Sequence, residues 1–146
     1  MTEVLIKRLS KNIEIPKYET SGSSGMDLSA NIEKQIKIEP GKTSIIPTGI
    51  SVSIPKNFEI QIRSRSGLAA KSQISVLNSP GTIDADYRGE LKVILINLSN
   101  KTFVVEKGTR VAQMVLCPIV KAKFKEVDSL DDTGRGVGGF GSTGLK

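Results

Sequence analysis

The sequence predicts an all-β, jelly-roll-like sandwich with one short helix and a flexible glycine-rich C-terminal arm. Apolar and polar side chains alternate over many short segments, which is the pattern of half-buried strands. Turn signals such as Pro40-Gly41 and Lys107-Gly108 separate these segments. Strands this short and numerous are typical of sandwiches and jelly rolls. The 146 residues fit one such domain, with strands expected at 36–38, 50–54, 58–62, 72–77, 91–98, 102–105 and 111–120.

One segment, SGLAAK at residues 66–71, predicts a helical turn, with Ser66 as the expected N-cap. Arg63 and Arg65 directly precede it. Guanidinium groups beside the unpaired amides of a helix start form a site for anions. On these residues alone, an ordinary helix start with solvated arginines remains the alternative.

The alternation stops after Lys125, and residues 126–146 contain six of the fourteen glycines. Such a segment cannot build a core. We therefore divide the chain into a β domain at residues 1–125 and an arm at residues 126–146. The arm carries groups that suit a phosphorylated aromatic ligand, and a merely flexible tail is the alternative. These groups are Arg135, Phe140, Ser142 and Thr143.

Histidine is absent and Cys117 is the single cysteine, which excludes Ser-His-Asp and Cys-His nucleophiles and His-ligated zinc or iron. Carboxylates with Mg²⁺, Mn²⁺ or Ca²⁺ remain, helped by lysine and arginine. Cys117 lies in an apolar run and is expected to be a buried structural thiol in a reducing compartment. We expect a cytoplasmic protein without a membrane partner, because no apolar stretch has the length of a signal or a membrane span.

The net charge of +6 is spread along the chain, and no basic run exceeds Lys7-Arg8. Aromatic residues are few, with four phenylalanines, two tyrosines and no tryptophan. Lys121, Lys123 and Lys125 alternate as on the outer face of a strand. Nucleic-acid binding is therefore not expected as the main role, since it favours clustered basic and aromatic side chains.

Residues 81–93, GTIDADYRGELKV, predict a loop that leads into the strongest strand. If this loop is extended, Asp84 and Asp86 point to the same side. Without histidine, these carboxylates are the natural candidates for a base. The alternative is that both aspartates only form a turn, that Tyr87 belongs to the core, and that Arg88 pairs with either acid.

Five segments in order resemble the motifs of the homotrimeric dUTPases, over nearly the whole chain. They are GMDLSA at 25–30, RSGLA at 65–69, the stretch 78–93, GTRVAQM at 108–114 and RGVGGFGSTG at 135–144. The resemblance implies a jelly-roll subunit, a homotrimer with shared active sites, and arms that close over them. It also implies Mg²⁺-assisted hydrolysis of dUTP to dUMP and pyrophosphate, which limits uracil incorporation into DNA and supplies dUMP for dTMP synthesis.

By the same resemblance, Asp84 is the general base that activates water for attack on the α-phosphorus. Tyr87 lies under the deoxyribose and leaves no room for a 2′-hydroxyl. Mg²⁺ is held mainly by phosphate oxygens and water, and Asp27 touches that shell or, as we favour, supports the site. Asp86 then has a structural role, such as pairing with a nearby arginine. The implied substrate-binding residues are Arg65, Ser66, Gly67 and Gln113 at the phosphates, Asn78 and Gly81 in the uracil loop 77–83, and Arg135, Phe140, Gly141, Ser142 and Thr143 in the arm.

Ser64 departs from the family pattern, which usually has proline before the second-motif arginine. A serine frees the backbone and could add a hydroxyl to the anion site, so the rigidity of Arg65 is in doubt. Two other functions remain open. One is dCTP deaminase, which shares the fold and much of the third motif but is usually longer and lacks this arm. The other is a non-catalytic nucleotide or protein binder.

Overall fold

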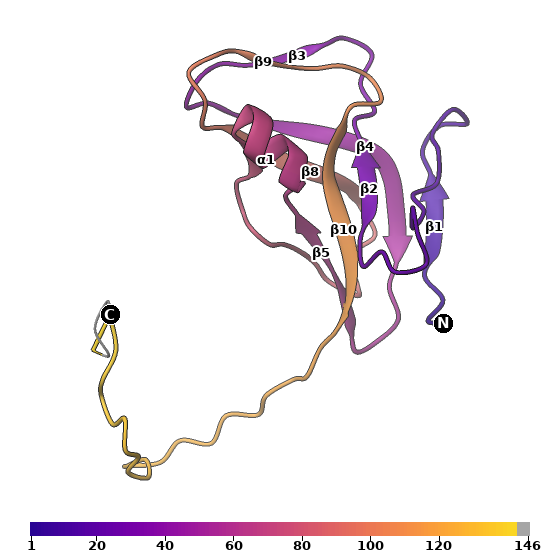
Figure 1. Ribbon diagram of the computed structural model, residues 1–146. Coiled ribbons are helices and arrows are strands. Elements are labelled where there is room, and N and C mark those ends of the chain that lie inside the picture. Colours follow the sequence, from indigo (N-terminus) through magenta and orange to yellow (C-terminus); the bar gives the residue numbers. More distant parts are fainter. Residues whose placement is uncertain (143–146) are drawn as a thin grey trace.

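The computed structural model describes residues 1–142, in which ten strands and one helix form three antiparallel sheets (Figure 1). This confirms the all-β, jelly-roll-like sandwich with one short helix. The elements are β1 (Leu5–Arg8), β2 (Met26–Ser29), β3 (Ile36–Ile38), β4 (Thr43–Ser53), β5 (Phe58–Arg63), α1 (Ser66–Ser72), β6 (Ile74–Val76), β7 (Gly81–Ile83), β8 (Glu90–Asn97), β9 (Phe103–Val105) and β10 (Arg110–Pro118).

Two four-stranded sheets enclose the core, one in the order β1-β4-β8-β6 and the other in the order β2-β10-β5-β7. Strands β3 and β9 form a separate pair. Ile46 and Leu95 from the first sheet and Ile60 and Val111 from the second are at most 1% exposed and belong to one hydrophobic cluster. Burial of each such side chain contributes about 1.5–3 kcal/mol, so the apolar positions of the alternation decide which face turns inward.

Strand β4 begins earlier than the sequence predicts, because Pro47 and Gly49 interrupt its alternation. The pairing of β4 with β8 shifts in register between Pro47 and Ser51, as at a β-bulge. Within this irregularity the Thr48 hydroxyl donates to the Leu91 carbonyl at 2.6 Å. These contacts let a proline and a glycine lie inside a long strand.

Helix α1 differs from the prediction at both ends. Arg65 is the N-cap, with extended backbone, and no side chain within residues 1–142 caps the helix. The expectation that Ser66 is the N-cap is therefore wrong, because Ser66 is already helical. Gln73 ends the helix in a left-handed conformation with φ of 53°. The strand expected at 72–77 consequently begins only at Ile74.

Strand β10 ends at Pro118, and residues 119–142 contain no strand or helix and run away from the β domain (Figure 1). Lys121, Lys123 and Lys125 therefore do not lie on a strand face, and that interpretation is wrong. Cys117 is only partly buried, against expectation, with the Arg63 guanidinium 3.7 Å from its sulfur. No helix within residues 1–142 is long and apolar enough to cross a membrane.

Candidate active site

Asp27 and Arg65 form the centre of a charged cluster at one end of the second sheet. The Arg65 Nε donates to Asp27 Oδ1 at 2.8 Å and its Nη2 donates to Oδ2 at 3.2 Å. The two side chains are 23% and 29% exposed, so solvent screens this bidentate pair only in part. A third donor, Arg65 Nη1, lies 3.4 Å from the Arg110 carbonyl. The carboxylate thus holds the arginine that precedes α1. This contact is compatible with the supporting role expected of Asp27, which remains a prediction.

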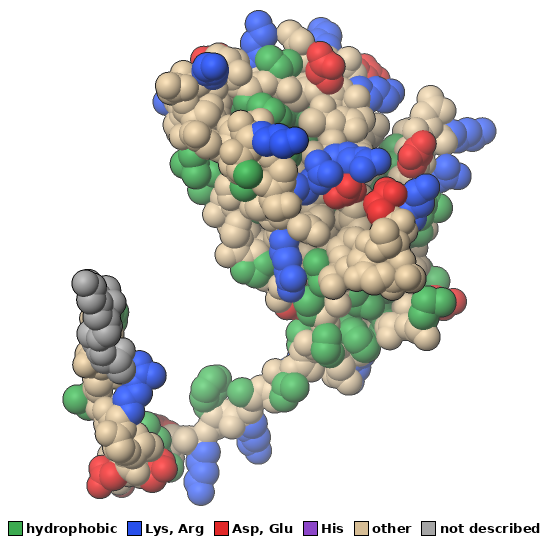
Figure 2. Space-filling view, viewed as in Figure 1, with side chains coloured by type: hydrophobic (Ala, Val, Ile, Leu, Met, Phe, Trp, Pro, Cys, Tyr) green, Lys and Arg blue, Asp and Glu red, His purple; other side chains and the backbone are tan. Residues whose placement is uncertain are grey.

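Arg110 is a member of this cluster that the sequence analysis did not single out. Its Nη1 donates to Asp27 Oδ2 at 3.2 Å, and its Nη2 lies 3.7 Å from Glu19 Oε1. All three side chains line a cleft of about 860 Å³. Basic and acidic side chains gather side by side on this face of the molecule (Figure 2). The available signal was the position of Arg110 inside the fourth motif, but its partner is 83 residues away in the chain.

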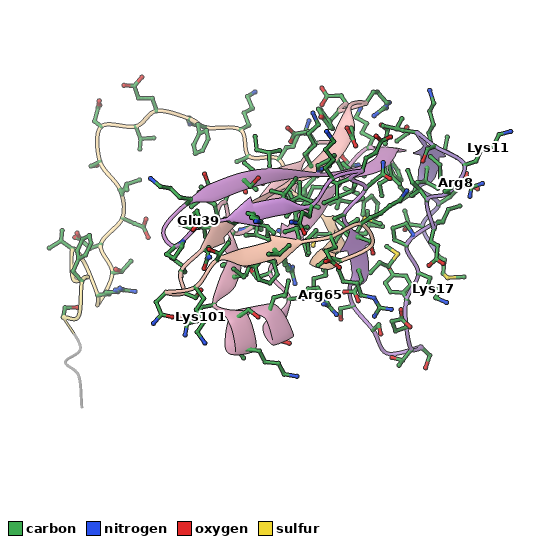
Figure 3. The ribbon with its side chains drawn as sticks, turned by 90° about the horizontal axis from the view of Figure 1, so that it is seen from above. Arg8, Lys11, Lys17, Glu39, Arg65 and Lys101 are labelled. Atoms are coloured by element: carbon green, nitrogen blue, oxygen red, sulfur yellow. The ribbon has the colours of Figure 1, made fainter. Side chains whose placement is uncertain are left out.

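Ser66 and Gly67 are exposed at the start of α1 and directly follow Arg65 in the chain. Figure 3 shows Arg65 beside this helix. The first amides of a helix have no partner inside the helix. Because no side chain of residues 1–142 caps them, these amides are free to meet an anion, while Arg65 is held by Asp27. The structure thus brings together the residues expected at the phosphates, and their role remains a prediction.

Gln113 joins the same cluster from β10, where it lies opposite Asp27 on one side and Arg63 on the other. Its Nε2 donates to the Ser64 carbonyl at 3.0 Å. Gly25 leaves room for this side chain, because a Cβ at Gly25 would lie 2.4 Å from Gln113 Oε1. The first, second and fourth motifs therefore meet in space.

The loop between β6 and β7 places Asn78 on the surface. Gly81 is buried opposite Ile62, and a Cβ there would lie 3.2 Å from Ile62 Cβ and 3.3 Å from Asn78 Nδ2. Only glycine fits this close approach without displacing its neighbours. Gly81 therefore shapes the loop that presents Asn78.

Asp84 and Asp86 lie in a turn, so the extended arrangement considered for them does not occur. The Tyr87 amide donates to the Asp84 carbonyl at 3.1 Å and closes this turn. Asp84 is exposed and, with Tyr87, lines a hollow of about 170 Å³ that Asp86 does not line. The two carboxylates therefore have different surroundings, and of the two only Asp84 lines this hollow.

Tyr87 is 43% exposed and is not a core residue. Its hydroxyl donates to the Glu90 carbonyl at 3.0 Å, and a Cβ at Gly89 would lie 2.4 Å from that hydroxyl. Arg88 donates to the carbonyls of Ala85 and Tyr87 at 2.7 and 2.9 Å. No salt bridge joins Arg88 to either aspartate within the described residues, so the pairing considered in the alternative interpretation does not occur. Arg88 instead stabilises the backbone of the turn.

The charged cluster and the Asp84 hollow lie at opposite ends of β5. Asp84 follows Ile83, which pairs with Ile60 near the start of β5. Arg65 lies five positions beyond Ile60, a separation of about 16 Å at the usual rise of a strand. The cleft and the hollow share no lining residue. One chain therefore does not bring its candidate base to its own phosphate-binding candidates.

The arm also lies apart from both places, as Figures 1 and 2 show. Phe140 is fully exposed with φ of 50°, and the Arg135 Nε donates to the Gly138 carbonyl at 2.8 Å. Gly141 and Ser142 are exposed as well. The structure thus does not join these expected arm residues to the rest of the site. Thr143 lies outside the described residues.

Comparison with known proteins decides the family. A family model described as dUTPase matches residues 11–144. The chain belongs to the dUTPase family. It is 55% identical over 146 residues to the deoxyuridine 5′-triphosphate nucleotidohydrolase of Rickettsia bellii, covering 99% of this chain and 97% of that one. The corresponding protein of Brucella melitensis is 51% identical over 137 residues, which cover 92% of this chain and 87% of the relative.

A solved dUTPase has the same fold. A variant of the dUTPase of Staphylococcus bacteriophage 80alpha, in complex with dUpNHpp, superposes with a TM-score of 0.88 at 26% identity. The likeness covers 99% of this chain and 100% of the phage chain. The dUTPase family match includes all expected site residues from Asp27 to Thr143, so both the charged cluster and the Asp84 hollow belong to the family region.

Proposed function

We propose that this dUTPase-family chain hydrolyses dUTP to dUMP and pyrophosphate, with Asp84 as the general base. The placement of Asp84 and Tyr87 in one hollow supports this most directly, because it puts an exposed carboxylate beside a ring suited to a sugar. The names of the relatives from Rickettsia and Brucella, and the nucleotide analogue bound by the phage protein, support the same substrate class.

In the proposed reaction the Asp84 carboxylate accepts a hydrogen bond from a water molecule and directs its oxygen at the α-phosphorus. As the new phosphorus–oxygen bond forms, Asp84 takes the proton, and the bond between the α-phosphorus and the bridging oxygen breaks. Pyrophosphate leaves with that oxygen. Positioning and general base catalysis act without a covalent intermediate, and a positioned base contributes roughly 10²–10⁴-fold.

Recognition of the nucleotide is divided among three groups of residues. The Tyr87 ring fills the space that a 2′-hydroxyl would need, and a filled space rejects the ribonucleotide. Asn78 and the backbone of loop 77–83 bind the uracil edge, with Gly81 keeping the loop tight. The amides of Ser66 and Gly67, together with Arg65 and Gln113, face the phosphates. The arm adds Arg135, Phe140, Gly141, Ser142 and Thr143, with Phe140 stacked on the base.

Mg²⁺ is the proposed cofactor. Residues 1–142 contain no group of three or more acidic or cysteine side chains that could hold a metal ion. Both carboxylate oxygens of Asp27 accept hydrogen bonds from Arg65 or Arg110. An acid engaged in this way suits a supporting role, with the ion held mainly by triphosphate oxygens and water. When bound with the triphosphate, Mg²⁺ supplies neutralisation of the charge on the leaving pyrophosphate.

A homotrimer with shared sites would bring the separated groups together. In one chain Asp84 follows the β5 partner of Ile60, and Arg65 lies about 16 Å beyond Ile60 along the extended backbone. The arm runs away from both. Val120 and Phe124 at the start of the arm are 99% and 94% exposed, which leaves apolar surface for neighbouring chains to cover.

Co-expression of two inactive chains tests the shared site. One chain carries Asp84→Asn and the other ends after Leu130. Mixed trimers contain sites with an intact base from one chain and an intact arm from another, so activity is expected to return. If each chain completes its own site, the mixture stays as inactive as the separate variants.

Hydrolysis in water enriched in ¹⁸O tests the reaction. Attack at the α-phosphorus places the label in dUMP and leaves pyrophosphate unlabelled, whereas label in pyrophosphate would contradict the mechanism. A panel of dUTP, dTTP, dCTP and UTP should show a clear preference for dUTP. Ammonia release from dCTP would support the deaminase, and no turnover at all would support a binding module.

Such an activity would limit uracil incorporation into DNA and supply dUMP for dTMP synthesis. We place the protein in the cytoplasm, because the single cysteine suits a reducing compartment. Nucleic acid and membranes are not part of the proposed function, since the basic residues are scattered along the chain.

A further inference from the structure

Strand β6 is the edge of the first sheet and has only three residues. The amide of Leu77, just after it, donates to the Ile94 carbonyl on β8 at 2.8 Å. Because neighbouring residues of a strand direct their polar groups to opposite sides, the amide and carbonyl of Val76 point away from β8. Such edge groups have no partner inside their own sheet.

Serine side chains satisfy both of these edge groups. The Val76 amide donates to Ser64 Oγ at 2.9 Å, and the Val76 carbonyl accepts a hydrogen bond from Ser79 Oγ. Ser64 Oγ also lies 3.0 Å from Ser75 Oγ. The end of β6 is therefore held from outside its sheet, at the point where the loop 77–83 begins.

Ser64 belongs to the segment between β5, in the second sheet, and α1. Its carbonyl accepts a hydrogen bond from Gln113 Nε2 at 3.0 Å, which fixes this segment to β10. The Ser64 hydroxyl thus connects a fixed position in one sheet to the edge strand of the other. The Ser64 hydroxyl is not part of the anion site, so that expectation from the sequence is wrong. The segment before Arg65 is held both by the bond from Gln113 and by the bond from the Val76 amide.

We propose that Ser64 is a positioning residue for the uracil loop 77–83. The inference rests on the proposed function, because the role of Asn78 in base recognition is part of it. A proline at position 64 has no hydroxyl and cannot accept the Val76 amide. This chain therefore uses a side-chain hydrogen bond to set where its loop begins, and the tightness of that loop decides how well uracil is distinguished from cytosine.

Ser64→Ala removes the hydroxyl that accepts the hydrogen bond of the Val76 amide. The ratio of kcat/KM for dUTP to that for dCTP should fall roughly three- to tenfold, the scale of one hydrogen bond. The change should lie in KM for dUTP, with kcat within about twofold, because Asp84 lies beyond β7. Ser64→Thr keeps a hydroxyl and should restore the ratio, whereas Ser64→Pro should behave like Ser64→Ala.

Ser44→Ala is the matched control, since Ser44 is a half-buried serine of β4 with no side-chain hydrogen bond among the described residues. It should change neither kcat nor the ratio. An equal loss of kcat for dUTP and dCTP in Ser64→Ala, or no rescue by Ser64→Thr, would overturn the positioning role.

Amide hydrogen exchange separates this inference from the proposed function, because it requires no substrate. The Val76 amide and the loop 77–83 should exchange faster in Ser64→Ala than in the native chain and in Ser44→Ala. Unchanged exchange would overturn the inference even in an active enzyme. Faster exchange in a chain that does not hydrolyse dUTP would instead overturn the proposed function and leave the contact to Val76 established.

Discussion

The Asp27 carboxylate and the Arg65 guanidinium form a bidentate pair, with nitrogen–oxygen distances of 2.8 and 3.2 Å, although 38 residues separate them in the chain. Arg110 approaches the same carboxylate from β10 at 3.2 Å. One acid thus orients two arginines of the second and fourth motifs, and the first motif acts through them.

Asp27→Asn should weaken the contacts to Arg65 and Arg110 without removing all of them. The asparagine side chain is neutral and has one acceptor oxygen, so it cannot keep both bonds from Arg65. Hydrogen bonds to charged groups contribute about 1.5–3 kcal/mol. We expect KM for dUTP to rise roughly tenfold or more and the melting temperature to fall by several degrees. Steady-state kinetics and thermal unfolding measure both. Glu19→Gln, which alters only the exposed contact of Arg110 at 3.7 Å, is the control and should have little effect.

Tyr87 should set the preference for the deoxyribonucleotide. Tyr87→Ala opens the space beneath the sugar, so the ratio of kcat/KM for dUTP to that for UTP should fall at least tenfold. Tyr87→Phe keeps the ring and loses only the bond to the Glu90 carbonyl, so most of the preference should remain. A Phe variant as indiscriminate as the Ala variant would show that the hydroxyl, rather than the filled space, rejects UTP.

Gly49 and Gly41 test the packing of the long strand. Both glycines have positive φ, 72° and 71°, but only a Cβ at Gly49 would collide, at 2.2 Å from Ile13 Cδ1. Gly41→Ala should therefore cost only the backbone strain of about 1–2 kcal/mol. Gly49→Ala should cost about 1–3 kcal/mol more, the usual penalty of overpacking. Urea unfolding of both variants measures the difference, and equal losses would show that the Ile13 side chain makes room for the added methyl group at no cost.

Removal of the arm should abolish turnover and spare the fold. Residues 119–142 contribute no strand or helix, and Phe124 and Phe140 are exposed in the single chain. A chain that ends after Leu130 should keep its circular dichroism spectrum and lose at least about a hundredfold in kcat/KM. Normal turnover by this chain would show that the arm has no part in the site.

Regular alternation made most strands predictable from the sequence. The pattern at 58–62 corresponds to β5, which spans Phe58–Arg63, and the pattern at 91–98 to β8, which spans Glu90–Asn97. Strands β1, β2 and β7 were not predicted, because they have only four, four and three residues, too few for their alternation to stand out. The end of α1 was missed for another reason. Gln73 adopts a left-handed conformation there, although glycine is the residue that usually marks such a helix end in a sequence.

The site residues were predicted from the motifs, but their arrangement was not. Contacts such as Arg110 to Asp27 join segments 83 residues apart, and spacing within a motif carries no information about them. The turn at Asp84 was ambiguous for a local reason, since aspartate forms turns as readily as it serves as a base. Only the hollow shared with Tyr87 separates Asp84 from Asp86 in the structure.

Pyrophosphate release from dUTP by the native chain, Asp84→Asn and Asp86→Asn tests the central claim most directly. Both variants make the same chemical change two residues apart in one exposed turn. If Asp84 is the base, Asp84→Asn loses roughly 10²–10⁴-fold in kcat, while Asp86→Asn stays within about threefold of the native rate. Full activity of Asp84→Asn, or an equal loss in both variants, would contradict the assignment.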